Sequence, residues 1–310
     1  MTISAVMPIY NTGEQLYKTL LSLLAQTEAD FELLMIDDCS TDQLTVQIEE
    51  TFARFDPRFK LRRNEKNMGA APSRNRGMKM AEGEYLICLD SDDLFAPEMM
   101  EIYSRTLEEN HAQIAIGSFL MKDIRTGETS LIVPQARPGI TDRVFSLKEL
   151  PDDGLNLWWP IAWNKMLRTS FLRETGIEYL ALPGYEDLYF GFASALRADR
   201  IAYCPLGDAL IIYLVGGSGQ LSYRADPRSI TRSIEKLLIE ESSGNHAHAI
   251  CQIMRELIMG VSQVLGRPAA EDQKQEYLEL VKKLVAEYTT EDSFEEEACR
   301  IRRRELLGVL

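Results

Sequence analysis

Three short apolar runs open the chain, and each is nearly continuous rather than alternating. They are "ISAVMPIY" (3–10), "FELLMID" (31–37) and "YLICLD" (85–90). Continuous runs of this length predict strands that are buried on both faces of a mostly parallel sheet. The segment "EQLYKTLLSLLAQ" (14–26) carries leucines at helical spacing, and residues 70–81 also predict a helix. This alternation of strands and helices indicates an α/β fold.

The middle of the chain is less regular but continues the same pattern. The run "AQIAIGSFLM" (112–121) predicts one strand, and "GETSLIVP" (127–134) predicts the return of a hairpin. Further on, "AWNKMLR" (162–168) and "ALIIYLV" (209–215) predict strands, while "YEDLYFGFASALR" (185–197) predicts a helix.

The pattern changes near residues 222–227, where amphipathic helical repeats replace the strands. We therefore predict an α/β domain over 1–225 and a helical region over 226–310. The last segment joins an acidic run to the basic run "RIRRRE". This pattern predicts a solvated helix, and contact with a membrane face or with a partner is the alternative.

Composition narrows the class of protein. The chain has 310 residues, 45% of them hydrophobic, and a formal net charge of −14. The hydrophobic content predicts a sizeable core, and the negative charge argues against a nucleic-acid partner. The five cysteines are scattered without a C-x-x-C pair, which is typical of reduced thiols. No secretory leader or spanning segment is expected, so the sequence predicts a cytoplasmic protein.

Carboxylates collect where the predicted strands end. One run ends in Asp37 and Asp38, and another ends in Asp90, Asp92 and Asp93. In open α/β sheets, ligands bind beyond the carboxyl ends of the strands. Like charges this close repel unless a cation lies among them, and carboxylate oxygens suit Mg²⁺ or Mn²⁺. The alternative is a solvated acidic loop.

The stretch "NMGAAPSRNRGMKMAEG" (67–83) predicts a turn at Asn67 and Gly69 followed by a helix with Pro72 in its first turn. A helix start favours anions. Arg74 and Arg76 lie two positions apart, so about one of them should face the site. The alternative is a capped surface helix. The chain contains no G-x-x-x-x-G-K-[ST] and no G-x-G-x-x-G after its first strand.

Six elements occur in the order and spacing of one known family. They are "PIYN", "IDDCSTD", "NMGAAPSRNRG", "LDSDD", "WNKMLR" and "GYEDLYF". Over about residues 1–225 the chain resembles the inverting family 2 glycosyltransferases of the GT-A fold. The resemblance implies a mixed, mostly parallel Rossmann-like sheet flanked by helices. It also implies a nucleotide-binding half over about 1–110 and an acceptor-binding half over about 111–225.

The resemblance implies a nucleotide-sugar, usually UDP-linked, and a Mn²⁺ or Mg²⁺ ion. Asp92 and Asp90 match the D-x-D metal ligands, with Asp93 supporting them. The residues implied to hold the nucleotide are Pro8, Tyr10, Asp38, Asn67, Gly69, Arg74, Asp90 and Ser91.

Asp187 matches the catalytic base of the family, with Glu186 as the alternative. The two point about 100° apart on a helix, so one of them should face the cleft. Trp163, Asn164 and Lys165 are expected on the acceptor side, and core packing is the alternative for the tryptophan.

Two departures from the family pattern bear on the site. Cys39 replaces a glycine, which predicts a tighter or differently shaped turn. Leu214 replaces an arginine that commonly follows the tyrosine in "YLVGGSGQLS" (213–222).

We expect a sugar transferase that acts on a glycan or lipid-linked acceptor, with surface polysaccharide synthesis as its setting. The alternative is a degenerate GT-A domain that only binds the nucleotide sugar. A phospho-acceptor receiver domain would explain Asp37 and Asp38 but needs only about half this length. Peripheral contact with the inner membrane face and a homodimer through the C-terminal helices are further expectations.

Overall fold

The computed structural model describes residues 2–134, 144–149, 161–205, 207–216, 226–242, 247–266, 269–290, 293 and 297–308. The chain forms two compact units. Unit 1 comprises Met1–Phe145, Ile161–Ala181 and Ala198–Ser218, and unit 2 comprises Ser146–Pro160, Leu182–Arg197 and Gly219–Leu310. All the strands described below belong to unit 1.

The main sheet of unit 1 has eight strands in the order β3-β2-β1-β4-β10-β6-β11-β9. Its strands are β3 (Phe59–Arg63), β2 (Phe31–Asp37), β1 (Ile3–Ile9), β4 (Tyr85–Cys88), β10 (Lys165–Arg168), β6 (Ile114–Ile116), β11 (Ile201–Tyr203) and β9 (Val144–Phe145). The first four are parallel to one another, whereas β10 runs antiparallel to both of its neighbours. The predicted mixed, mostly parallel sheet is therefore confirmed.

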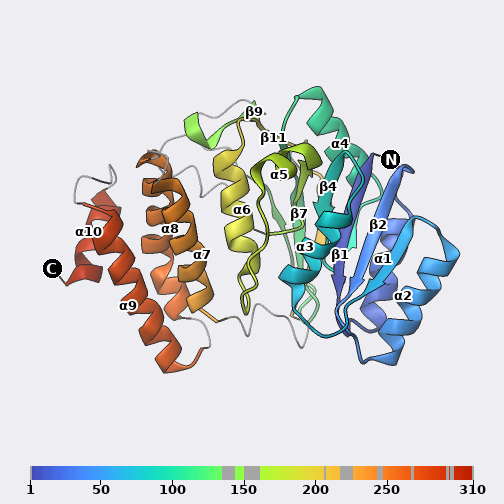
Figure 1. Ribbon diagram of the computed structural model, residues 1–310, viewed down its shortest axis with the longest axis horizontal. Coiled ribbons are helices and arrows are strands. Elements are labelled where there is room, and N and C mark those ends of the chain that lie inside the picture. Colours follow the sequence, from blue (N-terminus) through green and yellow to red (C-terminus); the bar gives the residue numbers. More distant parts are fainter. Residues whose placement is uncertain are drawn as a thin grey trace. The chain divides into compact units, whose positions relative to one another are not determined.

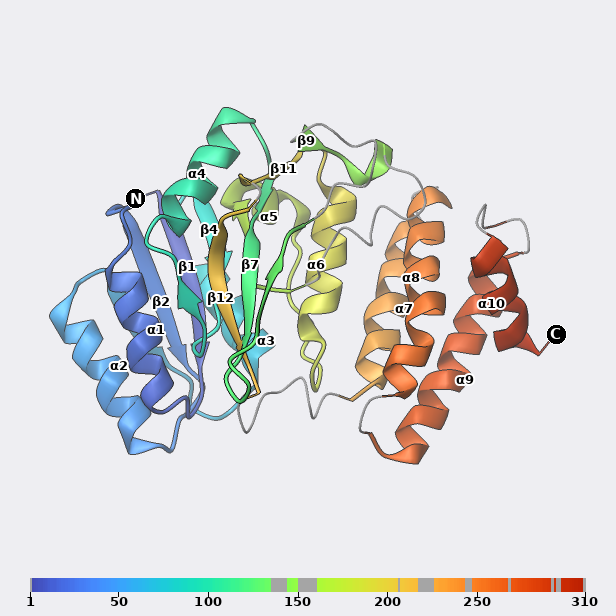
Figure 2. The same ribbon diagram turned by 180° about the vertical axis from the view of Figure 1, so that it is seen from behind.

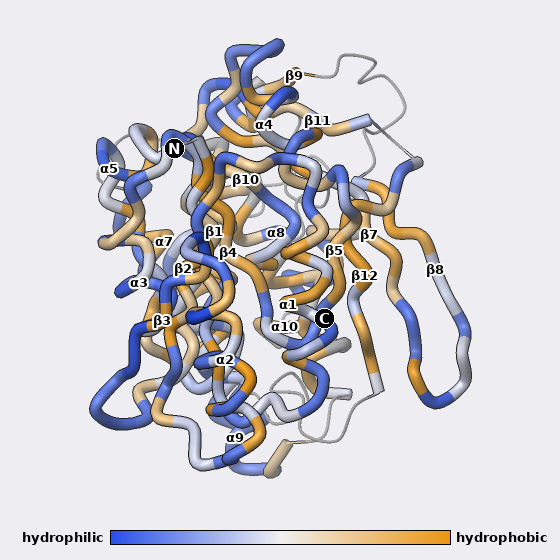
Figure 3. The backbone as a smooth tube through the Cα atoms, turned by 90° about the vertical axis from the view of Figure 1, so that its right-hand side faces the viewer, coloured by the Kyte–Doolittle hydropathy of each residue, from blue (hydrophilic) through white to orange (hydrophobic). Residues whose placement is uncertain are grey.

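A smaller sheet has the order β5-β12-β7-β8. Its strands are β5 (Leu94–Phe95), β12 (Ala209–Val215), β7 (Ser118–Asp123) and β8 (Thr129–Ile132). The predicted hairpin is confirmed, since β7 and β8 pair antiparallel. Figure 3 shows its turn as a largely hydrophilic end.

The prediction of one strand over 112–121 is wrong, because the chain passes from the main sheet to the small sheet at Gly117. The glycine lies between β6 and β7. A Cβ at this position would lie 2.4 Å from the hydroxyl oxygen of Tyr103. Only a residue without a side chain fits this crossing point.

Helices cover both faces of the parallel half of the sheet (Figures 1 and 2). The helices of unit 1 are α1 (Glu14–Leu24), α2 (Gln43–Phe55), α3 (Ala70–Met80), α4 (Met99–Glu109) and α5 (Thr169–Thr175). Helix α3 packs closely on β1, since a Cβ added to Gly77 would lie 2.3 Å from Cγ1 of Val6. This close approach fixes α3 over the strand ends that the site uses.

Unit 2 is helical, as the sequence predicts for residues after 226. It contains η1 (Leu147–Glu149), α6 (Glu186–Arg197), α7 (Arg228–Ser242), α8 (Ala247–Leu265), α9 (Glu271–Tyr288) and α10 (Glu297–Leu307). Helix α6 groups with α7 because Glu240 accepts hydrogen bonds from Tyr189 at 2.8 Å and from Arg197 at 2.6 Å. Packing thus assigns α6 to this unit, and the domain boundary near residue 225 stays a prediction.

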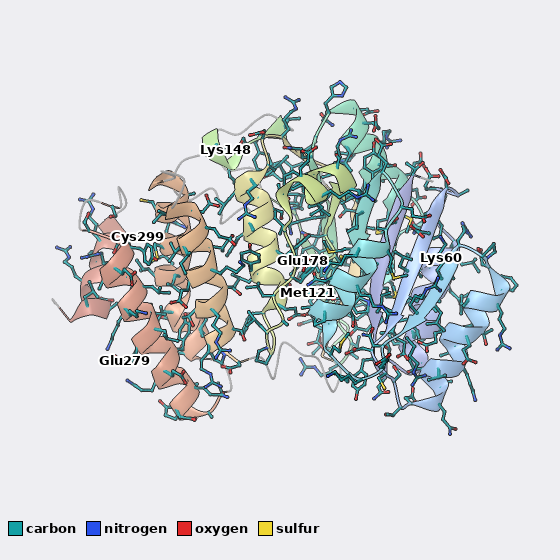
Figure 4. All side chains as sticks on the ribbon, in the orientation of Figure 1. Lys60, Met121, Lys148, Glu178, Glu279 and Cys299 are labelled. Atoms are coloured by element: carbon teal, nitrogen blue, oxygen red, sulfur yellow. The ribbon has the colours of Figure 1, made fainter. Side chains whose placement is uncertain are left out.

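Figure 4 shows the side chains of unit 2, including Cys299 on α10 and Glu279 on α9. Cys299 is buried, whereas Glu279 lies on the solvent side and pairs with Lys282 at 3.3 Å. Within the part of the chain that the structure describes, no cysteine forms a disulfide. Within the described residues, no helix combines the length and the apolar content that crossing a bilayer requires.

Candidate active site

The candidate site lies at the carboxyl ends of β1, β2 and β4. Ile9 pairs with Asp37 and Val6 pairs with Cys88 in parallel register, so these strands end at the same edge of the sheet. The loops that follow carry the polar residues that the sequence pattern singled out. Their convergence comes directly from the parallel pairing.

Side chains cross-link the loop after β1 to its neighbours. Oδ1 of Asn11 accepts hydrogen bonds from the backbone N–H groups of Thr41 and Asp42, at 2.8 and 2.9 Å. The Thr12 hydroxyl lies 2.8 Å from the Ser91 hydroxyl in the acidic turn. Sequence reasoning missed Thr12, and the only local signal was a hydroxyl three residues beyond a strand.

Asp38 holds the turn that precedes α3. Its carboxylate accepts from Asn64 Nδ2 at 2.7 Å, from Met68 N–H at 2.9 Å and from Gly69 N–H at 2.7 Å. Asp38 is 3% exposed, so its carboxylate oxygens bond to groups of the protein rather than to solvent. The observed role of Asp38 is to shape the loop, and contact with a nucleotide stays a prediction.

The other predicted nucleotide residues flank this loop. Tyr10 is 49% exposed just beyond β1, and Pro8 is partly buried within the strand. Asn67 is exposed, and Gly69 adopts a φ of 92° immediately before α3. Glycine suits this position because residues with a side chain rarely adopt this left-handed conformation.

The turn at Cys39 keeps a conformation that glycine would adopt. Cys39 has a φ of 64°, in the left-handed region that glycine favours. The cysteine takes up this conformation at a cost in backbone strain. The expectation of a tighter or differently shaped turn stays a prediction.

Asp90, Asp92 and Asp93 form one cluster, with ligand oxygens all within 4.8 Å of one another. Burial, and then the Asp90 charge, raise the pKa of Asp92 to about 6. The same two causes raise the pKa of Asp93 well above its usual range. Both carboxyl groups are therefore harder to ionise in the folded chain than in water.

Asp93 is the most enclosed carboxylate of the cluster, being fully buried. Oδ1 accepts from the backbone N–H of Leu214 in β12 at 3.1 Å. Oδ2 is also buried and has no hydrogen-bond partner among the described residues. A buried oxygen without a donor has the chemistry of a metal ligand or of a group that supports one.

Arg74 is the cation of the site. Its Nη2 donates to Oδ1 of Asp90 at 2.6 Å, and the guanidinium lies over the ring of Tyr179 at 5.3 Å. Arg76 instead donates to Oδ1 of Asn64 at 2.5 Å. The expectation that one of the two arginines faces the site is met by Arg74.

The three residues predicted on the acceptor side are buried. Trp163 is 3% exposed and packs edge-on against Phe119 and tilted against Tyr213. Lys165 is 1% exposed and donates to Oδ1 of Asn164 at 2.5 Å. Burial favours the core-packing alternative for Trp163, and an acceptor-side role for Asn164 and Lys165 stays a prediction. Trp158 and Trp159 lie outside the described residues.

Glu186 and Asp187 begin α6, as predicted, and both are partly buried. Gly184 and Tyr185 precede them with φ values of 90° and 54°. A left-handed conformation is costly for an aromatic residue, and such strain often accompanies functional positions. Both carboxylates belong to unit 2.

A mixed α/β sheet whose strand-end loops gather carboxylates and an arginine fits the GT-A fold of glycosyltransferases. Residues 4–176, more than half of the chain, match the family described as "Glycosyl transferase family 2". The chain belongs to this family and is a glycosyltransferase.

Relatives and solved structures agree with this assignment. The chain is 29% identical over 252 residues to the uncharacterized glycosyltransferase YibD of Escherichia coli, covering 76% of this chain and 70% of that protein. It is 36% identical over 125 residues to glycosyltransferase GlyG of Streptococcus pneumoniae, covering 40% of this chain and 41% of that protein.

Among solved structures, residues 1–349 of TarS from Staphylococcus aureus in complex with UDP-GlcNAc superpose with a TM-score of 0.71 at 21% identity. The alignment covers 99% of this chain and 89% of that one. The GT-A fold of this chain is thus shown by an independent comparison. The matched stretch of GlyG, however, is less than half of that protein.

Proposed function

We propose that this chain transfers a sugar from a UDP-sugar to a hydroxyl of a glycan or lipid-linked acceptor, with inversion and with a divalent cation. The observation that carries the proposal is the carboxylate cluster at the meeting point of three parallel strands, with a buried, unpartnered oxygen on Asp93. An oxygen cluster of this kind suits Mg²⁺ or Mn²⁺.

The names of the structural neighbours support the nucleotide and the cation. TarS structures hold UDP-GlcNAc or UDP, and the mannosyltransferase PcManGT from Pyrobaculum calidifontis holds GDP-Man and Mn²⁺. The PcManGT structure superposes with a TM-score of 0.52 at 14% identity. TarS, which is 28% identical over 228 residues, is named as a poly(ribitol-phosphate) β-N-acetylglucosaminyltransferase. These names favour a surface polymer as the acceptor.

Asp92 and Asp90 would hold the cation, with Asp93 supporting them from the buried side. The bound cation would neutralise the charge that develops on the nucleoside diphosphate as it leaves. Arg74 orients Asp90, and the loop held by Asp38 is proposed to border the nucleotide. Tyr10, half exposed beyond β1, offers an aromatic face for a base.

Asp187 is proposed to take the proton from the attacking acceptor hydroxyl, with Glu186 as the alternative. The start of α6 favours an ionised carboxylate, because backbone N–H groups and the helix dipole stabilise negative charge there. An ionised carboxylate is the form that can accept a proton.

Thermal unfolding with nucleoside diphosphates, each with and without Mn²⁺, tests the proposal. Ligand at a hundred times its dissociation constant adds roughly 2.7 kcal/mol of stability. We expect a shift with UDP that requires Mn²⁺ and that disappears in Asp92→Asn. Binding without any sugar transfer to surface-polymer acceptors would favour a degenerate binding domain. No shift with any nucleotide would refute the metal–nucleotide site.

A further inference from the structure

A single carboxamide holds both polar backbone groups of Tyr179. The Tyr179 N–H donates to Oδ1 of Asn75 at 2.8 Å, and its carbonyl oxygen accepts from Nδ2 of Asn75 at 2.8 Å. Residues 177–181 follow α5 without helix or strand pairing. Backbone groups in such a segment need partners, and a carboxamide supplies a donor and an acceptor together.

Tyr179, the residue that Asn75 holds, covers the guanidinium of Arg74. The ring of Tyr179 lies 5.3 Å from the guanidinium carbon of Arg74, and both residues are buried. A buried guanidinium is costly without compensating contacts, and an aromatic face is one of them. Two consecutive residues of α3 therefore act on this contact. Arg74 provides the guanidinium, and Asn75 holds Tyr179, whose ring lies over it.

A second contact joins the same helix to the same segment. Lys79, one turn beyond Asn75, pairs with Glu178 at 2.8 Å, and both side chains are exposed. Figure 4 shows Glu178 beside α3. An exposed ion pair contributes little to stability, so the Asn75 hydrogen bonds are the stronger tie. Lys79 therefore provides a matched control on the same face of α3.

We propose that Asn75 and Tyr179 are positioning residues for the carboxylate cluster, an inference that rests on the proposed function. Asn75 fixes the backbone of Tyr179, the Tyr179 ring confines the Arg74 guanidinium, and Arg74 holds Asp90 in orientation. Without the cover, Arg74 gains rotamers and releases Asp90. The like charges of the cluster then drive the Asp90 carboxylate away from the others.

Calorimetric titration of UDP at saturating Mn²⁺ tests this chain of contacts in the full protein. For Asn75→Ala we expect the Kd of UDP to rise about tenfold, equivalent to about 1.4 kcal/mol. Lys79→Ala should leave the Kd unchanged. If Asn75 acts through the ring, Asn75→Ala should add almost nothing in a Tyr179→Ala background.

Two further measurements separate positioning from general destabilisation. Leu107→Ala, at a fully buried position of α4, should lower the melting temperature without changing the Kd. Without ligand, the backbone amides of residues 86–95 should exchange hydrogen faster in Asn75→Ala than in wild type. Adding Tyr179→Ala should not increase the exchange rate further. If Asn75→Ala fails to fold, Asn75→Asp, which keeps only the acceptor, replaces it.

The outcomes distinguish the two proposals. Wild-type protein that binds no nucleotide refutes the proposed function, and the exchange measurement still decides the positioning role. Unchanged exchange at 86–95 in Asn75→Ala overturns that role. The positioning role is also overturned if Asn75→Ala changes the Kd of UDP as much in a Tyr179→Ala background as it does in wild type.

Discussion

Nη2 of Arg74 lies 2.6 Å from Oδ1 of Asp90, which joins the first turns of α3 to the acidic loop after β4. The arginine is 5% exposed and the aspartate 29% exposed. This charge-assisted hydrogen bond offsets one of three clustered negative charges. Burial, and then the charge of Asp90, raises the pKa values of Asp92 and Asp93.

Arg74→Ala should therefore destabilise the protein by about 2 kcal/mol, since it removes a hydrogen bond between charged groups and leaves Asp90 unpaired. Mn²⁺ should stabilise the variant less than it stabilises wild type, because Asp90 is no longer held beside the other carboxylates of the cluster. Thermal unfolding with and without Mn²⁺ measures both effects. Arg62→Ala, which removes an exposed positive charge, is the control, and an equal loss in both variants would contradict the assignment.

Asp187→Asn should lower kcat by about a hundred- to ten-thousand-fold, the range that general-base assistance supplies. UDP binding in the presence of Mn²⁺ should not change, because the amide removes only the proton acceptor. Glu186→Gln is the matched control at the adjacent position of α6. The loss of activity appearing in Glu186→Gln instead would assign the base to Glu186.

Glu49 should make stability depend on pH. It is 1% exposed on α2, and burial, followed by the Asp37 charge, raises its pKa to about 8. Between its ordinary value of 4.5 and about 8, the folded chain holds a proton that the unfolded chain has lost. The stability that Glu49 contributes is therefore fully present at low pH. It decreases as the pH rises and is lost once the pH passes about 8.

Glu49→Gln stays neutral at every pH, so its stability relative to wild type should rise between about pH 5 and pH 8 and level off above that. Urea unfolding at several pH values measures the difference. Glu50→Gln, at the exposed neighbouring position, should show no such trend. A difference between Glu49→Gln and wild type that stays constant with pH would mean that Glu49 ionises normally.

Cys39 should tolerate glycine better than a β-branched residue. At a φ of 64°, glycine relieves backbone strain but costs entropy on folding, so Cys39→Gly should change stability by less than about 1 kcal/mol. Cys39→Val should destabilise more than Cys39→Gly does, because a β-branched side chain adds crowding to a left-handed conformation that is already strained for cysteine. Denaturant midpoints provide the comparison, and equal values for valine and glycine would show that the turn relaxes.

Local sequence patterns were sufficient for the main elements and for the position of the site. Continuous apolar runs indicated β1, β2 and β4, because strands covered on both faces exclude polar residues. The carboxylates beyond those runs then had to meet, because parallel strands end at one edge. The helix over 70–81 and the helices after 226 followed from periodicity alone.

Tertiary structure decided what depends on contacts between distant segments. Apolar content could not reveal that the run 112–121 divides between two sheets, since the cause is the approach of Tyr103 to Gly117. The sequence left core packing as one of two alternatives for Trp163, and the contacts of its ring with Phe119 and Tyr213 favour that alternative.

The site shows the same division. The sequence by itself determined that acidic groups and an arginine would gather at one sheet edge, because strand direction fixes where the loops emerge. Only the folded chain decided that Arg74 rather than Arg76 pairs with Asp90, and that Asn75 clamps Tyr179, 104 residues away. Hydrogen bonds of this kind depend on the packing of α3 against the sheet, which no local pattern encodes.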